Sequence, residues 1–276
     1  MSYKTIMVCL NELPANARVM DVAAQLGVKF KAHVRGVYVI PGAQVFGGEA
    51  YTLTPIVFDA TRVFFQEQKE KVRAAFEGAM KAQGVTFDFE VVDSNLPNIT
   101  QEVISASRSA DLLVISALPA NGDDNIEDDL VERTILAAGC PVLVLPAGGT
   151  FTFNADEVVL GWDASREAAR ALHDALPFFK GSRLVRICSV DAAPDGTVPG
   201  ADVAESLDRH GIKASVEKVS SDGRNAGATL LRAANDFGAG LLVMGCYGHG
   251  RFSEFVFGGA TRHVLASLDR AVLMSH

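Results

Sequence analysis

The sequence predicts an α/β protein made of two copies of one unit, each with helices packed around a parallel sheet. Two observations lead to this fold class. Short apolar segments alternate with Ala-rich segments of helical pattern along the chain, which is typical of βαβ units. The same order of segments then recurs in the second half of the 276 residues, and such self-similarity indicates a duplicated domain.

Each copy begins with a short apolar strand that ends on a polar residue, Asn11 in the first copy and Asp163 in the second. An Ala-rich helix and a second strand follow, then a third strand, another helix and a fully apolar fourth strand. We expect the helices after the third strands to begin at Asn98 and Asn225, because asparagine is a good N-cap. The matching segments are 4–11 with 156–163, 33–40 with 183–190, 87–94 with 214–221, 111–116 with 240–245, and 132–145 with 261–274.

The two copies are expected to form domains at residues 1–147 and 154–276. A short stretch with Pro and Gly, at 146–156, is the natural junction. The first copy carries a longer insertion at 41–84, and its apolar and aromatic residues are too many for a solvated loop. A flap over a pocket, an interface segment and internal packing are the three interpretations, of which internal packing is the simplest.

Composition excludes several classes of protein. The longest apolar runs are strand-sized, far below the roughly 20 residues of a membrane span, and the N-terminus resembles a strand more than a signal peptide. The expected location is therefore the cytoplasm, with no membrane contact. The net charge of -8 disfavours an extended contact with nucleic acid. Cys9, Cys140, Cys188 and Cys246 lie far apart with no CxxC spacing, so we expect reduced packing residues and no metal site.

A glycine-rich loop follows the fourth strand of the second copy, in the stretch "LLVMGCYGHGRFSEFVFGGATRHVL" (241–265). Gly245 and Gly248 come directly after the strand, and Gly258 and Gly259 lead into a helical pattern. Glycine lets backbone N–H groups approach a ligand closely, and a helix start adds unpaired donors and partial positive charge. The loop therefore predicts an anion site, with phosphate as the usual occupant. It matches neither the P-loop nor the dinucleotide pattern.

The glycines fit the pattern G-x2-G-x9-G on the fourth strand of a unit whose first strand ends in Asp163. Together with "GWDASREAARAL" (161–172) and "GCPVLVLP" (139–146), this pattern resembles the universal stress protein family, and the whole chain resembles a tandem member. The resemblance implies two doubly wound sheets of five mainly parallel strands with helices on both faces, of the adenine-nucleotide alpha-hydrolase-like type. It also implies ATP or AMP as the ligand, with or without Mg2+.

The resemblance assigns roles to the residues of the glycine loop. Gly245 and Gly248 would hold the phosphates through backbone N–H groups, and Gly258 would let the next helix start close to them. Family members usually have Ser or Thr after the last glycine, where this chain has Gly259. Thr261, two residues later, matches another hydroxyl position and would supply the missing contact.

The adenosine end of the ligand is assigned to the first two strands of the second copy. Asp163 occupies the family's acidic position, where a carboxylate bonds adenine or ribose. Val190, at the end of the second strand, matches a residue whose backbone contacts adenine. The resemblance thus places the whole nucleotide in the second copy.

The first copy departs from the family pattern and is expected to hold no nucleotide. Asn11 replaces the aspartate, while Ser116 and Pro119 replace the two loop glycines. Like charges near a phosphate chain would oppose binding. The acidic residues that crowd this segment are Asp123, Asp124, Glu127, Asp128 and Asp129.

The sequence shows no nucleophile and base pair, since Ser253 has no identifiable partner. The leading hypothesis is a non-catalytic stress-response or regulatory module that binds ATP or AMP. Slow ATP hydrolysis or autophosphorylation, and a nucleotide-free structural or chaperone-like adaptor, are the alternatives. Self-association of the two domains is expected through the last strands, at 141–146 and 271–275, and a homodimer is left open. Cys246 is either a redox-sensitive gate or, more simply, a side chain packed under the loop.

Overall fold

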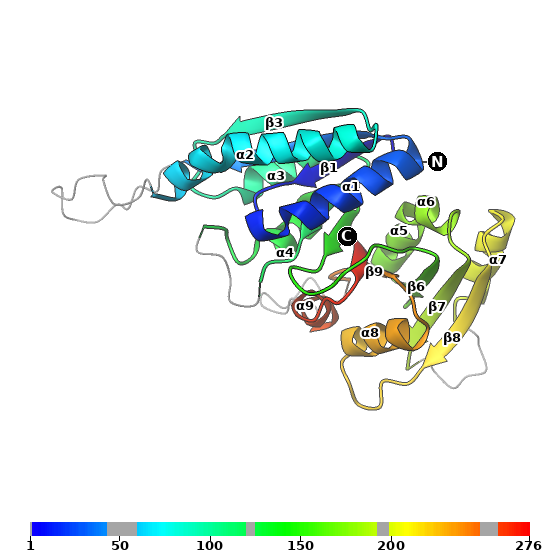
Figure 1. The fold of residues 1–276 in the computed structure, drawn as a ribbon. Helices are drawn as coiled ribbons and strands as arrows, with labels where there is room; N and C mark the ends of the chain where they lie inside the picture. Colours follow the sequence, from blue (N-terminus) through cyan, green and yellow to red (C-terminus); the bar gives the residue numbers. More distant parts are fainter. Residues whose placement is uncertain (1, 43–59, 120–124, 192–198, 249–258) are drawn as a thin grey trace, which may run out of the picture. The chain divides into compact units, whose positions relative to one another are not determined.

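The computed structural model describes residues 2–42, 60–119, 125–191, 199–248 and 259–276. They divide into two compact units, Tyr3–Thr134 and Ile135–His276, called the N-terminal and C-terminal units below. The predicted fold class is confirmed in both: parallel strands alternate with helices along the chain (Figure 1).

The N-terminal unit contains parallel strands in the order β3-β2-β1-β4. Because the chain moves from β1 to β3 in one direction and then returns to β4, right-handed crossovers place its helices on both faces. Helices α1 and α2 contact each other and lie across these strands (Figure 1). The elements are β1 (Thr5–Cys9), η1 (Leu13–Ala15), α1 (Asn16–Phe30), β2 (His33–Ile40), α2 (Ala60–Ala82), β3 (Phe87–Asp93), α3 (Thr100–Ser107), β4 (Leu112–Ser116) and α4 (Leu130–Ala137), which crosses into the C-terminal unit.

Helix α2 accounts for most of the described part of the insertion predicted at 41–84, and two of its three aromatic residues are core residues. Phe65 and Phe76 are fully buried. Tyr38 donates a hydrogen bond to the backbone oxygen of Phe65 over 2.8 Å, and the Phe76 ring lies 5.8 Å from that of Phe87 on β3. Internal packing, the simplest of the three interpretations, therefore holds for residues 60–82. Residues 43–59 lie outside the described part.

The C-terminal unit contains the parallel strands β8-β7-β6-β9-β10. Helix α5 covers β9 and β10, whereas α8 packs on β6, β7 and β9 and contacts α9. The elements are β5 (Val142–Leu145), β6 (Glu157–Gly161), α5 (Arg166–Asp174), α6 (Leu176–Phe179), β7 (Leu184–Val190), α7 (Ala201–Arg209), β8 (Ala214–Val219), α8 (Ala226–Asp236), β9 (Leu241–Gly245), α9 (Gly259–Ala266) and β10 (Ala271–Ser275).

Strand β5 comes from the first sequence repeat but belongs to the C-terminal unit, where it pairs antiparallel with β10. The register places Val144 opposite Val272. The expected contact between the strand segments at 141–146 and 271–275 is therefore present. The compact units divide between Thr134 and Ile135, upstream of the junction expected at 146–156.

One of the two expected helix caps is confirmed and the other is wrong. Asn225 caps α8, because its Oδ1 accepts a hydrogen bond of 2.7 Å from the backbone N–H of Gly227. Asn98 is not a cap: α3 begins at Thr100, and the cap position is held by Ile99, whose oxygen accepts from the Val103 N–H. Ile99 is buried with helical backbone angles, so packing of an apolar side chain sets this helix start.

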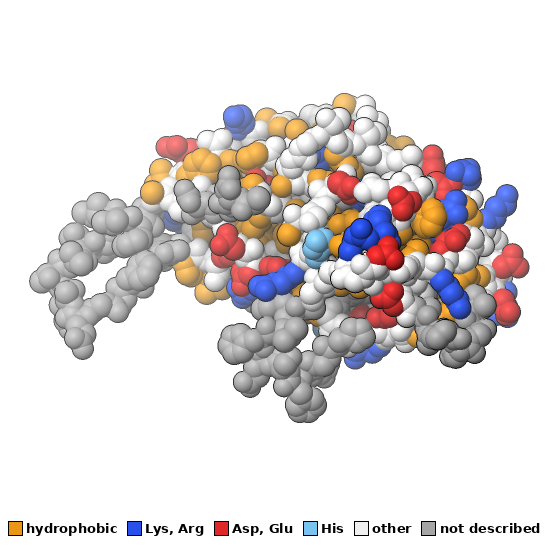
Figure 2. Space-filling view, turned by 90° about the horizontal axis from the view of Figure 1, so that it is seen from below, with side chains coloured by type: hydrophobic (Ala, Val, Ile, Leu, Met, Phe, Trp, Pro, Cys, Tyr) orange, Lys and Arg blue, Asp and Glu red, His pale blue; other side chains and the backbone are white. Residues whose placement is uncertain are grey.

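The surface carries charges of both signs. On the face drawn in Figure 2, acidic and basic side chains are interspersed. No helix in the described part of the chain is long and apolar enough to span a membrane.

Candidate functional site

A pocket of about 350 Å3 lies in the C-terminal unit, where β6, β7 and β9 end and lead into loops and helices. This is the edge of an open α/β sheet at which ligands usually bind, and the volume is at the lower end of the range for small-molecule sites. Its described lining consists of Gly161, Trp162, Asp163, Ser165, Glu167, Ala168, Cys188, Val190, Asp191, Ala226, Leu230, Met244, Gly245, Tyr247, Gly248, Ala260 and Thr261.

The pocket brings together most of the site residues predicted from the sequence. Gly259 does not line it, although it begins α9. A Cβ at this position would make a tight contact of 3.1 Å with Asn225 Nδ2. Gly258 lies outside the described residues. The predicted residues that line the pocket are Asp163, Val190, Gly245, Gly248 and Thr261.

Both loop glycines lie close to the start of α5, and packing requires glycine at position 245. A Cβ on Gly245 would lie 2.4 Å from the backbone nitrogen of Ala168 and 2.4 Å from the backbone carbon of Glu167. A Cβ on Gly248 would lie 2.7 Å from Glu167 Oε2. All three distances are below a normal contact with carbon. A side chain at 245 would displace the backbone of α5, whereas one at 248 would displace only the end of the Glu167 side chain. Close approach explains Gly245 before any ligand is considered.

Glu167 is a pocket residue that the sequence analysis missed. It lies in the first turn of α5 and is only 7% exposed. Burial raises the pKa of this carboxyl, but hydrogen bonds from its own backbone N–H and from the Arg166 guanidinium, at 2.8 Å from Oε1, outweigh burial and hold the pKa below its usual value. Glu167 therefore carries a negative charge at neutral pH.

Asp163 lies at the rim of the pocket with its side chain exposed. Its Oδ1 accepts a hydrogen bond of 2.9 Å from the Ser165 N–H, and Ser165 caps α5 by accepting from the Ala168 N–H at 3.1 Å. Between them, Ala164 has a φ of 60°, a left-handed conformation that costs a non-glycine residue roughly 1–2 kcal/mol. This tight turn joins β6 to α5, and the Asp163 carboxylate within it remains exposed.

Thr261 and Cys246 lie beneath the loop. Both side chains are buried, with 2% and 1% of their surface exposed. Burial raises the pKa of Cys246 to about 12, although a hydrogen bond with Thr261 lowers it somewhat. The thiol is thus protonated and covered, which supports the packing interpretation over a redox-sensitive gate. The Thr261 hydroxyl, expected to contact a ligand, is also engaged with this thiol.

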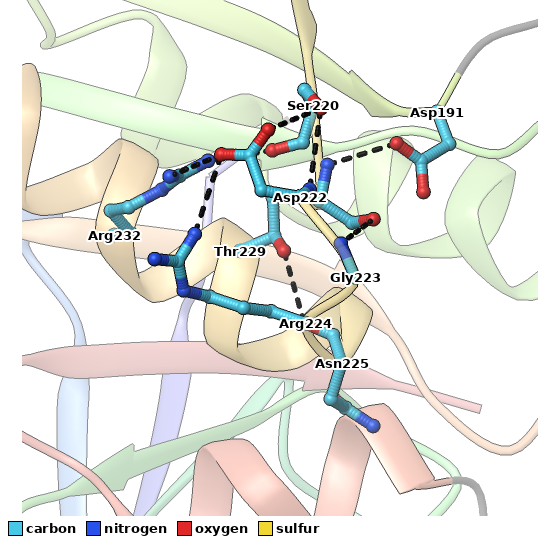
Figure 3. A network of polar contacts seen from close by, with 9 residues as sticks. Asp191, Ser220, Asp222, Gly223, Arg224, Asn225, Thr229 and Arg232 are labelled. Carbon is cyan, nitrogen blue, oxygen red and sulfur yellow. Dashed lines mark hydrogen bonds and ion pairs between the residues drawn. The ribbon is translucent and has the colours of Figure 1, made fainter.

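The polar loop between β8 and α8 contacts Asp191, a residue of the pocket lining that directly follows β7 (Figure 3). The Asp191 carboxylate accepts the Ser221 N–H at 2.9 Å. Further out, Asp222 accepts hydrogen bonds from Arg232 at 3.0 Å and from Arg224 at 3.3 Å. The composition of the run "SSDGRN" (220–225) predicts a turn. It does not predict that this turn holds the carboxylate of Asp191, which follows the neighbouring strand β7.

Comparison with known protein families identifies the C-terminal part of the chain. Residues 154–276 match the model of the universal stress protein family. They form a universal stress protein domain. A search of curated protein sequences finds no match to this chain.

Solved structures of universal stress proteins share the fold along the whole chain. A universal stress protein from Archaeoglobus fulgidus DSM 4304 is 19% identical over 98% of this chain and 95% of that chain, with a TM-score of 0.71. A structure assigned to the universal stress proteins from Pseudomonas aeruginosa UCBPP-PA14 is 13% identical over 99% and 93%, with a TM-score of 0.60. A shorter structure, an Archaeoglobus fulgidus universal stress protein in complex with dAMP, is 20% identical over 52% and 98%, but its TM-score of 0.36 is too low to bear on the site.

The universal stress protein domain differs from the N-terminal unit at the end of the first strand. Val37 pairs with the last residue of β1, as Cys188 pairs with the last residue of β6. Two residues further on, Val39 is therefore equivalent to Val190. In the N-terminal unit the Asn11 side chain, 1% exposed, donates to the Val39 oxygen at 2.7 Å and accepts the Val39 N–H at 3.0 Å. In the N-terminal unit, the backbone groups equivalent to those expected to contact adenine are therefore already hydrogen-bonded to Asn11.

The glycine positions of the universal stress protein domain are also filled in the N-terminal unit. Ser116, equivalent to Gly245, is buried, and its hydroxyl donates to the Ala117 oxygen at 2.8 Å. Of the acidic residues expected to oppose a phosphate, Asp128 and Asp129 are exposed, and residues 120–124 lie outside the described part.

Proposed function

We propose that the universal stress protein domain binds an adenine nucleotide, ATP or AMP with or without Mg2+, and acts as a non-catalytic stress-response or regulatory module in the cytoplasm. The observation that carries the proposal is the pocket, which collects Asp163, Val190 and the two loop glycines from three strand ends. A nucleotide that binds one conformation better than another shifts the population towards it, which is a physical basis for sensing.

The adenosine half of the ligand is the better supported half. Asp163 offers an exposed carboxylate to ribose or adenine, and Val190 lines the same pocket. Leu230, Met244 and Cys188 give the pocket an apolar part of its lining, as expected of a surface that covers a base. A bound base would thus have an apolar face and polar groups at its edge.

The first repeated domain, proposed to span residues 1–147, does not take part in binding. Its strand end is closed by Asn11, which is buried and bonded to both backbone groups of Val39. A ligand would have to break these hydrogen bonds before it could form its own. We therefore expect one nucleotide per chain.

The first test measures binding of ATP and AMP by isothermal titration calorimetry, after mass spectrometry of any ligand released from the purified protein. Asp163→Ala should weaken binding about ten- to hundredfold, because a hydrogen bond to a charged group contributes roughly 1.5–3 kcal/mol. Asp208→Ala, an exposed acid on α7, is the matched control and should bind normally. Two equivalents per chain would contradict the assignment to one domain.

Turnover distinguishes the remaining functions. Bound ATP that stays intact over hours supports a binding module. ATP hydrolysis or autophosphorylation that Asp163→Ala abolishes would instead show an enzyme. A protein that releases no nucleotide and binds neither ATP nor AMP would be the structural or chaperone-like adaptor.

A further inference from the structure

The described lining of the pocket is acidic. It contains the carboxylates Asp163, Glu167 and Asp191, and none of its described members is a lysine, arginine or histidine. Sites for phosphate chains normally supply positive charge or several free N–H groups. The described lining therefore contributes negative and no positive side-chain charge to the place where a nucleotide is proposed to bind.

Glu167 lies against the turn in which a phosphate is expected. Its Oε2 lies 2.7 Å from where a Cβ on Gly248 would be, so the carboxylate faces the turn "GCYG" (245–248) directly. Its own N–H, at the start of α5, is hydrogen-bonded to the carboxylate. A helix start favours an anion at this point, and here the anion is part of the protein.

The charge on Glu167 is only partly balanced. Arg166 contacts Oε1 at 2.8 Å, but the arginine side chain is 71% exposed to water. Solvent screens such an arginine, whereas the glutamate is buried and screened much less. His276 also acts on this carboxylate electrostatically. A phosphate in the turn would nevertheless approach a buried, negatively charged group next to Gly248.

We propose that Glu167 makes this pocket select adenosine and AMP over ATP. The inference rests on the proposed binding of adenine nucleotides and names the ligand class within it. Each added phosphate brings further negative charge towards a buried carboxylate, and like charges in a partly buried site repel each other strongly. Gly245 accommodates the backbone of α5, and no polyphosphate is needed to explain this glycine.

The test compares the dissociation constants of adenosine, AMP and ATP by isothermal titration calorimetry, with EDTA and again with excess Mg2+. In the unmodified protein, ATP should bind at least tenfold more weakly than adenosine in both conditions. Glu167→Gln should reduce the ratio of the ATP constant to the adenosine constant at least tenfold. Glu205→Gln, which removes an exposed carboxylate on α7, changes net charge equally and should leave the ratio unchanged.

A second variant works in the opposite direction and does not depend on the folding of the first. Arg166→Gln removes the partner of Glu167 and should increase the ratio several-fold. ATP that binds as tightly as adenosine, or a ratio that neither variant changes, would overturn the role of Glu167. If none of the three ligands binds, the proposed function itself fails, which is a separate result from a wrong preference among ligands.

Discussion

The two units use the same strand end in opposite ways. In the N-terminal unit, Asn11 folds back onto Val39 and closes the edge of the sheet with two buried hydrogen bonds. In the C-terminal unit, the equivalent Asp163 stays exposed and the edge opens into a pocket. An amide can satisfy both a donor and an acceptor, whereas a carboxylate can only accept. The amide of Asn11 therefore bonds both backbone groups of Val39, which a carboxylate could not do, and the common fold does not determine function.

The largest effect on stability is expected from exchanging the equivalent residues at the ends of β9 and β4. Gly245→Ser should lower the free energy of unfolding by more than about 3 kcal/mol, because its Cβ would collide with backbone atoms of α5 that cannot rotate away. Ser116→Gly, the reverse change in the other unit, should cost only about 1 kcal/mol. Urea denaturation of both variants measures the difference, and equal losses would show that the two loops pack alike.

The next largest effect concerns the closed strand end. Asn11→Leu should destabilise the protein by about 2–3 kcal/mol, because both Val39 backbone groups would be buried without partners. Asp163→Leu at the equivalent exposed position should cost less than about 1 kcal/mol. Guanidinium denaturation provides the values. If Asn11→Leu proved neutral, Val39 would be reached by water and the first pocket would not be closed.

A smaller effect, a gain in stability, is expected at Ala164, the residue after Asp163. Ala164→Gly should stabilise the protein by about 0.5–1 kcal/mol, since it relieves a left-handed alanine at φ 60° and this gain exceeds the entropic cost of glycine. The equivalent Glu12 has φ -81°, so Glu12→Gly should give no gain. Thermal unfolding monitored by circular dichroism compares them, and a loss of stability in Ala164→Gly would refute the strain.

The smallest difference between the two units is expected in the reactivity of their buried thiols. Burial raises the pKa of Cys9, Cys188 and Cys246 to about 12 in each case, so at pH 8 only about one in ten thousand of these thiols is ionised. Cys140 is partly exposed and should react first with iodoacetamide. Mass spectrometry of the native protein identifies the labelled site, and labelling of Cys246 as fast as Cys140 would revive the redox interpretation.

The sequence was sufficient for the fold and for the position of the pocket, because both follow from local patterns. Alternation of strands and helices indicated the parallel sheets, and polar residues at strand ends indicated Asp163 and the glycine loop. Glu167 was missed because an acid in the first turn of a helix is common and suggests only a favourable helix start. The Asn11 contact was also out of reach, since it depends on the register between two strands separated by a helix.

The antiparallel pair of β5 and β10 has a consequence for synthesis on the ribosome. Strand β5 is synthesised almost half a chain before its partner β10. The edge of β5 that pairs with β10 therefore has no partner strand while the second repeat is being synthesised. Such edges invite pairing with other chains, and contacts between distant segments form late. This edge of β5 is therefore open to other chains until β10 has been made. A fragment that stops before residue 271 would remain permanently in that state.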